Sequence, residues 1–139
     1  MLLPSHPEPV RDNRATNRIW FRALAFYGTA LFTGNAKHRQ LGVEFAQSAF
    51  AQFDAKTGIF LENGGGDSSY QGVNLINASR YSFLLPLSDP FRAQIQRAVI
   101  AGANWEIGKI KATGEISTEG NTRVFPGGES FLGDRKSVV

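Results

Sequence analysis

Two acidic residues lie close together in the most unusual stretch of this chain, which runs from Lys56 to Gly72 and has the sequence KTGIFLENGGGDSSYQG. Glu62 and Asp67 flank three consecutive glycines in this stretch. Glycoside hydrolysis requires two carboxyl groups at a suitable separation, one of them kept protonated. The pair is therefore the candidate catalytic pair. The simpler alternative, which stays open here, is that Asp67 caps a following helix and Glu62 is solvated.

One aromatic and three polar residues have side chains suited to binding a sugar. Tyr70 offers a flat face to a sugar ring, although such aromatics more often pack the end of a helical bundle. The other three, Glu119, Asn121 and Arg123, lie within five residues of chain. An arginine or amide there would neutralise a uronic-acid carboxylate while a nearby base removes the adjacent proton. The alternative is a surface turn in which Arg123 pairs with Glu119.

Other kinds of chemistry have little support in the chain. There are no cysteines, which excludes disulfides, thiolate metal sites and cysteine nucleophiles. His6 and His38 are the only histidines, and neither has a second ligand three or four residues away. No lysine follows the three glycines at P-loop spacing, and no strand is predicted before them. We therefore expect no metal site and no cofactor.

Hydrophobic periodicity predicts four helices that position these residues. They span approximately residues 14–32, 36–53, 68–85 and 89–110. Gly34 and Asn35 are typical of a C-cap followed at once by an N-cap, so the first two helices should form an antiparallel hairpin. Asp89 before Pro90 is a strong start signal for the fourth helix.

The starts of the first and third helices are predicted from capping residues. Asp12 or Asn13 is the candidate N-cap of the first helix, and Ser68 with Gln71 fits a capping box at the start of the third. The first helix is apolar around most of its circumference. Such a helix must be covered on nearly all sides.

A partial repeat organises the whole chain. The segment Thr57–Gly64 lines up with Thr113–Gly120, and both copies follow a helical pattern, which gives a repeat of about 56 residues. Units of this length bury their apolar faces against neighbours. Because both copies follow the C-terminal end of a second helix, we expect the two loops at the same end of the bundle. The candidate site residues Glu62, Asp67, Tyr70, Glu119, Asn121 and Arg123 would share one polar rim there.

The predicted fold is all-α, with two antiparallel helical hairpins built from four main helices and long glycine-rich loops at one end. Residues 1–13 are expected to form an extended arm because they contain three prolines. Residues 14–133 are expected to form a single helical-hairpin domain, followed by a tail of residues 134–139. At 139 residues the chain is long enough to bury one hydrophobic core.

These residues resemble a known architecture. Tandem helical hairpins with glycine-rich loops gathered at one end are similar to part of an (α/α) toroid, shared by six-hairpin glycosidases and toroid-type polysaccharide lyases. The segment Glu62–Gly72 is similar to the acid-Gly-Gly-x-Asp-x-x-Tyr loops at the inter-hairpin junctions of such proteins. Toroids of this kind usually contain five to seven hairpins, whereas this chain supplies two. The resemblance therefore implies a toroid-like arrangement without a complete catalytic motif.

Composition limits the partners of the chain. The net charge is +3, but the 15 basic residues are dispersed along the sequence, which is not typical of a nucleic-acid binder. No apolar run reaches the length of a membrane span. The first residues lack the apolar core of a signal peptide, so the protein is expected to be cytoplasmic, or processed and periplasmic, and the sequence does not decide between them.

Two functions follow as expectations. The first is a carbohydrate-related module that resembles part of a toroid-type glycan-processing protein, is not catalytic alone and has an oligosaccharide as a possible partner. If it had an activity, it would be that of a glycoside hydrolase or polysaccharide lyase. The second is a helical scaffold that binds proteins without catalysis. A homo-oligomer or another chain is expected to complete the helical layer. The alternatives, which stay open here, are that the hairpins are a detached part of a larger ancestor or that they close on themselves as a four-helix bundle.

Overall fold

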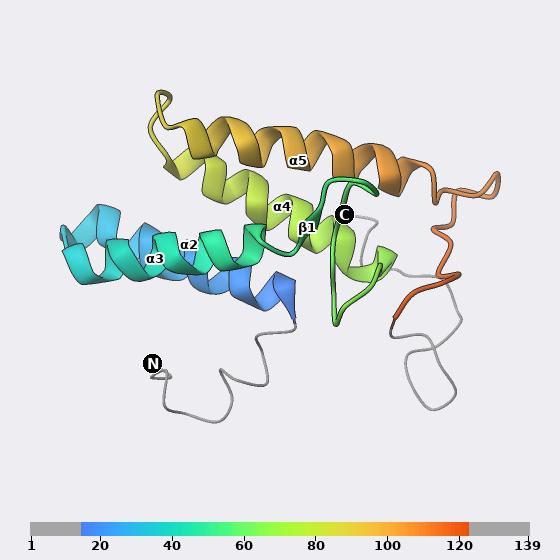
Figure 1. The fold of residues 1–139 in the computed structure, drawn as a ribbon, viewed down its shortest axis with the longest axis horizontal. Coiled ribbons are helices and arrows are strands. Elements are labelled where there is room, and N and C mark those ends of the chain that lie inside the picture. Colours follow the sequence, from blue (N-terminus) through green and yellow to red (C-terminus); the bar gives the residue numbers. More distant parts are fainter. Residues whose placement is uncertain (1–14, 123–139) are drawn as a thin grey trace.

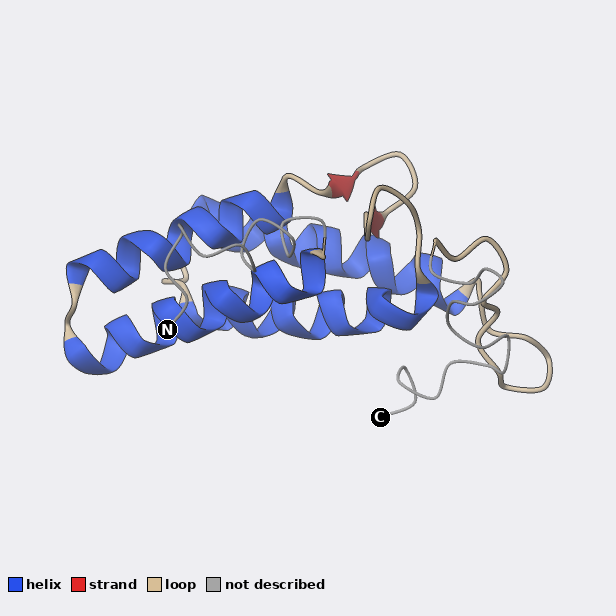
Figure 2. Cartoon of the chain, turned by 90° about the horizontal axis from the view of Figure 1, so that it is seen from below, coloured by secondary structure: helices blue, strands red, loops and turns tan. Residues whose placement is uncertain are grey.

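The described part of the chain is mostly helical. A computed structural model describes residues 15–122. It contains four helices, α2 (Thr16–Thr33), α3 (Ala36–Phe50), α4 (Ser68–Leu84) and α5 (Pro90–Ile107), and a two-stranded antiparallel sheet of β1 (Phe53–Asp54) and β2 (Ile59–Phe60) (Figure 1). The prediction of a largely helical chain is confirmed at this level. The small sheet, confined to one side of the helices in Figure 2, is an addition to it.

Short connections join the helices in pairs, α2 with α3 and α4 with α5. Gly34 ends α2 with a positive φ of 68°, and the side chain of Asn35 accepts a hydrogen bond from the His38 N–H at 3.1 Å. Asp89 caps α5, whose first residue is Pro90. These three predicted capping positions are confirmed. Each connection is too short for anything but an antiparallel hairpin.

The two hairpins pack together through their first helices. α2 contacts both α3 and α4, and α4 in turn contacts α5. The core between α2 and α4 is aromatic: Tyr81 lies 5.9 Å from Trp20 and 5.3 Å from Tyr27 between ring centroids, and all three side chains are buried. This burial raises the pKa of the Tyr81 hydroxyl above its usual range.

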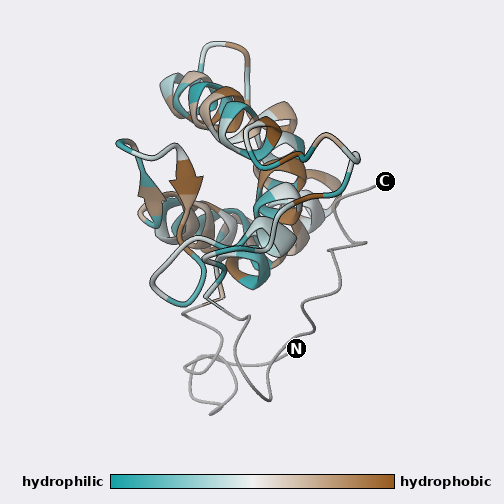
Figure 3. Ribbon diagram, turned by 90° about the vertical axis from the view of Figure 1, so that its right-hand side faces the viewer, coloured by the Kyte–Doolittle hydropathy of each residue, from teal (hydrophilic) through white to brown (hydrophobic). Residues whose placement is uncertain are grey.

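The second helix is shorter than predicted, because Phe53 belongs to a strand and α3 ends at Phe50. Phe53 pairs with Phe60 in the sheet, and their rings lie 5.1 Å apart. Phe50 packs edge-on against Phe91 of α5 at 5.3 Å. These aromatic contacts fill the space between α3, the sheet and α5. Their packing outweighs the helical spacing that placed Phe53 in the predicted second helix. Figure 3 shows the strands from the loop end of the molecule, with β2 brown as hydrophobic residues and β1 partly teal at Asp54.

The predicted capping box at the start of the third helix is wrong. The N-cap of α4 is Asp67, whose side chain accepts from the Ser69 N–H. Gln71 instead uses its side-chain oxygen to accept from the Phe60 N–H at 3.1 Å. The Gln71 side chain, which local spacing assigns to the helix end, therefore bonds to the amide of a strand residue that precedes it in the chain.

The start of the first helix also differs from the prediction. α2 begins at Thr16, and Ala15 at its N-cap position makes no side-chain capping bond. The predicted caps Asp12 and Asn13 lie outside the described residues. The N–H groups at the start of α2 must therefore find acceptors elsewhere.

Candidate functional site

The two loops that follow the hairpins contact each other directly. The Thr122 N–H donates to the Gly66 carbonyl at 3.0 Å, and the Thr122 hydroxyl donates to the Glu62 carbonyl at 3.0 Å. Gly65 lies so close that an added Cβ would sit 2.3 Å from the Thr122 methyl group. The loops lie at the right-hand end of Figure 1, opposite the two hairpin turns.

Glu62 begins a tight turn in the first loop. Its N–H donates to the Gly65 carbonyl at 2.7 Å. Asn63 and Gly64 between them have positive φ angles of 55° and 87°. Asparagine followed by glycine is the preferred pair for a turn of this geometry. The turn directs the Glu62 side chain toward the helices, where it is fully buried.

The Glu62 carboxylate lies at the start of α2. Its Oε2 atom accepts from the Asn17 N–H at 3.3 Å and from the Asn74 side-chain amide at 3.4 Å. Asn17 is the second residue of α2, so this carboxylate supplies the acceptor that Ala15 lacks. A negative charge there is also stabilised by the helix dipole. Glu62 therefore links the first loop to α2 and to α4.

Asp67 lies at the start of the other central helix. It is 2% exposed, and its Oδ1 atom accepts from the Ser69 N–H at 2.9 Å. The Asn121 side-chain amide approaches the same oxygen at 3.5 Å. The two candidate carboxylates thus cap two different helices, Glu62 on α2 and Asp67 on α4. Their catalytic role stays a prediction.

Asn121 is the residue of the second loop that joins this cluster. It is 6% exposed, and its Oδ1 atom accepts from the Ser68 N–H at 3.0 Å. The Ser68 hydroxyl donates to the Ser117 carbonyl at 2.8 Å. The start of α4 is therefore bonded both by Asp67, which directly precedes the helix, and by the second loop.

Equivalent bonds recur in the two halves of the chain. The first residue of α2, Thr16, donates its hydroxyl to the Leu61 carbonyl, and the first residue of α4, Ser68, donates its hydroxyl to the Ser117 carbonyl. Leu61 and Ser117 occupy matching places in the two copies of the TG segment. Each loop therefore returns to the start of the first helix of its own hairpin.

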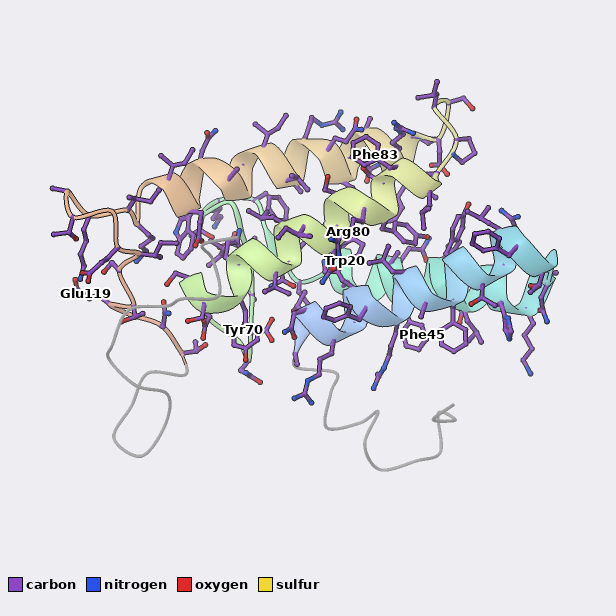
Figure 4. The ribbon with its side chains drawn as sticks, turned by 180° about the vertical axis from the view of Figure 1, so that it is seen from behind. Trp20, Phe45, Tyr70, Arg80, Phe83 and Glu119 are labelled. Carbon is purple, nitrogen blue, oxygen red and sulfur yellow. The ribbon has the colours of Figure 1, made fainter. Side chains whose placement is uncertain are left out.

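The remaining candidate residues are placed differently. Tyr70 lies in the first turn of α4 and is half-buried (Figure 4). Glu119 is exposed at the far end of the second loop, where its backbone carbonyl accepts from Lys109 Nζ at 3.2 Å. Arg123 lies outside the described residues. Of the six residues assigned to the polar rim, hydrogen bonds bring Asp67 and Asn121 together, with Glu62 joined to the second loop through Thr122.

The sequence interpretation missed polar residues on α4 that help to build this region. Gln71 and Asn74 are buried and bond to β2 and Glu62, while Asn77 is buried farther along α4. Their spacing of three residues places them along the same side of a helix. That spacing is the signal in the sequence that indicates a polar buried face.

Within residues 15–122, no three histidine, cysteine, aspartate or glutamate side chains gather as a metal site would require. No helix in the same residues is long and apolar enough to cross a membrane.

Comparisons with protein-family models, curated proteins and solved structures give no significant match to this chain. The interpretation of the site therefore rests on its geometry.

Replacing Asp67 with alanine tests the capping role of this residue. We expect a loss of about 1–2 kcal/mol in the free energy of unfolding, the usual cost of removing an N-cap, measured by urea denaturation. The matched control is Asp89→Ala, because Asp89 caps α5 through the Phe91 N–H at 2.9 Å. Similar losses in the two variants indicate a structural cap. An unchanged stability in Asp67→Ala alone would contradict it.

Proposed function

We propose that this chain is a helical interaction module without a catalytic site of its own. The observation that supports this most is the use of the two candidate carboxylates. Glu62 is 0% and Asp67 2% exposed, and each accepts a hydrogen bond from the N-terminal backbone of a helix. A general acid or nucleophile must reach its substrate, whereas a helix cap bonds only to the chain's own backbone and needs no access from outside.

Apolar side chains on the outside of the helices support a binding role. Among them, one pair on each of α2, α4 and α5 lies at a spacing close to whole helical turns. Isolated exposed apolar residues are ordinary, but aligned sets mark interaction surfaces. They are Phe21 at 52%, Phe32 at 93%, Ile76 at 46%, Phe83 at 67%, Ile100 at 64% and Ile107 at 63% exposed.

In this proposal the two hairpins are toroid-like repeat units. Support comes from the packing of the first helices of both hairpins, α2 and α4, against each other. It also comes from the matching hydroxyl-to-carbonyl bonds of Thr16 and Ser68 at the starts of these helices. Repeat units of this kind each bury one face against a neighbour and leave the terminal faces open.

The mass of the protein in solution tests the proposal. We expect light scattering on a sizing column to give a mass above the 15.2 kDa of one chain as the concentration rises from micromolar to submillimolar. Aligned apolar faces favour this outcome because association removes them from water. A mass of one chain over the whole range would contradict association of the module with itself.

A carbohydrate-related role is the second candidate, and the position of Tyr70 favours it. This half-buried aromatic lies beside the loops, where a ring face would be available to a sugar. Titration with neutral and uronic-acid oligosaccharides, followed by NMR of the backbone amides, tests this role. Shifts confined to α4 and both loops, and lost in Tyr70→Ala, would support it. An unshifted spectrum at millimolar sugar would leave only the interaction module.

A further inference from the structure

The two central helices can be compared residue by residue. Thr16 and Ser68 are the first residues of α2 and α4 and make equivalent hydroxyl bonds, so they provide the starting point of the alignment. Counting along both helices from there matches Leu24 with Ile76 and Leu31 with Phe83. The same count matches Trp20 with Gly72 and Tyr27 with Ser79.

The side of α2 that packs on α4 has an exposed counterpart on α4. α2 approaches α4 through Trp20 and Tyr27, whose rings contact Tyr81. On α4 the positions matching Trp20 and Tyr27 are Gly72 and Ser79, and beside them lie two large apolar side chains, Ile76 at 46% and Phe83 at 67% exposed, which match Leu24 and Leu31. We name this surface the α4 outer face, made of Gly72, Ile76, Ser79 and Phe83. In Figure 4, Trp20 lies between the two helices, whereas Phe83 lies near the turn to α5.

The reverse comparison identifies an exposed face on α2. The side of α4 that faces α2 includes Asn77 and Tyr81, which match Ala25 and Thr29. Both of these residues are exposed. Large exposed apolar side chains lie beside them, 52% exposed at Phe21 and 93% exposed at Phe32. We name this surface the α2 outer face, made of Phe21, Ala25, Thr29 and Phe32.

We propose that a second copy of this chain docks head-to-tail, with the α4 outer face of one copy against the α2 outer face of the next. The contact would continue the packing of α2 on α4 that already exists inside each copy. The partner is argued from the internal repeat, because the α4 outer face occupies the positions through which α2 packs on α4. This inference rests on the proposed function and names the partner for it.

The two faces differ in the sizes of their residues. Gly72 and Ser79 are the small residues of the α4 outer face, where α2 carries the large Trp20 and Tyr27. Because Tyr81, which contacts Trp20 and Tyr27, matches Thr29, the continued packing would place Thr29 of the docking copy against Gly72 and Ser79, with Phe21 and Phe32 beside it. Because the two faces differ, the contact is heterologous and generates a ring or an open filament rather than a closed two-fold dimer.

Two single variants test the docking because each blocks only one face. Phe21→Asp places a charge on the α2 outer face, and Ile76→Lys places one on the α4 outer face. We expect each variant alone to be a monomer at concentrations where the wild type is a multimer. Mixed in equal amounts, they should form a dimer of about twice 15.2 kDa, since one intact α4 outer face meets one intact α2 outer face. Light scattering on a sizing column measures all three samples.

A matched control separates this contact from general loss of apolar surface. Ile110→Lys introduces the same charge at a residue that is 50% exposed and belongs to neither face, so its association should equal that of the wild type. All variants should melt at the temperature of the wild type under conditions where the wild type is monomeric. A lower melting temperature for Phe21→Asp or Ile76→Lys there would mean that the chain's own residues cover the face, and would overturn the proposal.

The other outcomes are also decisive. Loss of association in Ile76→Lys but not in Phe21→Asp would indicate a two-fold contact between α4 outer faces. That result would overturn the head-to-tail arrangement. A wild-type multimer unaffected by either variant would overturn the docking and leave the proposed interaction module intact. A wild type that stays monomeric would overturn the docking and leave a different chain as the partner of the proposed interaction module. Restored association in the mixture, with neither variant associating alone, is the result that only two different faces produce.

Discussion

Replacing Glu62 with alanine will lower the free energy of unfolding by about 3 kcal/mol, because the change leaves buried donors without their acceptor. The Glu62 carboxylate accepts from the Asn17 N–H and the Asn74 amide, and the site is closed to water, with Glu62 0% exposed. Hydrogen bonds to a charged group contribute about 1.5–3 kcal/mol each, and their loss is not fully additive. Urea denaturation followed by circular dichroism measures the loss.

The matched control is Glu119→Ala in the second loop. Glu119 is exposed, and its hydrogen bond from Lys109 is accepted by the backbone carbonyl, which the substitution keeps. Its stability should stay within about 0.5 kcal/mol of the wild type. Equal stability of Glu62→Ala and Glu119→Ala would exclude the capping role and make a catalytic Glu62 the better hypothesis.

Glu62→Gln separates charge from hydrogen bonding at the same position. The amide oxygen still accepts from Asn17 or Asn74, while the interaction of a negative charge with the α2 dipole is lost. The loss should therefore be smaller than that of Glu62→Ala. A glutamine variant as unstable as alanine would mean that the charge provides most of the stabilisation.

The caps that local sequence predicts are those made within a few residues. Gly34 and Asn35 were found from the sequence because both residues act on the turn in which they lie. Asp89 before Pro90 is of the same kind. Gln71 was assigned to the wrong partner because its side chain bonds to Phe60, which belongs to a different element. Local spacing contains no information about which distant backbone amide needs an acceptor.

The interpretation of Glu62 and Asp67 as a pair has the same origin. Their short separation in the chain suggests two carboxylates acting on one substrate. The folded chain instead sends Glu62 to the start of α2, 45 residues away, while Asp67 caps the adjacent α4. What the sequence contains is a loop rich in helix-capping groups. Which helix each group caps is decided by the packing of α2 against α4.

The internal repeat was visible in the sequence, but its structural meaning was not. The matched glycines Gly58 and Gly114 both have positive φ angles, 79° and 83°, and so do Gly64 and Gly120, 87° and 79°. Only glycine adopts this conformation at little cost, which explains why these positions stand out in the comparison. The bonds that the two loops make to Thr16 and Ser68 involve residues outside the repeated segment. They became visible only in the fold.

The exposed faces follow from the same repeat. The first helix is apolar on nearly all sides, which predicts complete cover, yet Phe21 and Phe32 remain open. Inside the chain, α4 covers one side of α2 and α3 covers another. A two-hairpin array has one open face at each end by construction. In the proposed head-to-tail contact, these apolar residues lie at the positions where the next copy would pack.

Replacing Gly42 with alanine will cost about 3 kcal/mol in the free energy of unfolding, at the upper end for overpacking, because α3 approaches the backbone of α2 closely at this residue. An added Cβ would lie 2.7 Å from the Tyr27 Cβ and backbone nitrogen and 2.8 Å from its Cα. Tyr27 is 4% exposed, and its ring packs against Tyr81, so neither helix moves without disturbing the core. Thermal and urea denaturation measure the change.

Gly28→Ala is the matched control, since Gly28 also lies within a helix but has nothing within 4 Å of an added Cβ. Alanine is the better helix former by roughly 1 kcal/mol, so this variant should be more stable than the wild type. In sequence the two mid-helix glycines look alike, and only the approach of α3 to Tyr27 makes their substitutions opposite in sign. Stabilisation by both alanines would mean that α2 and α3 are farther apart than the fold requires. Both outer faces, and the head-to-tail contact between copies, would then need a different arrangement of the first hairpin.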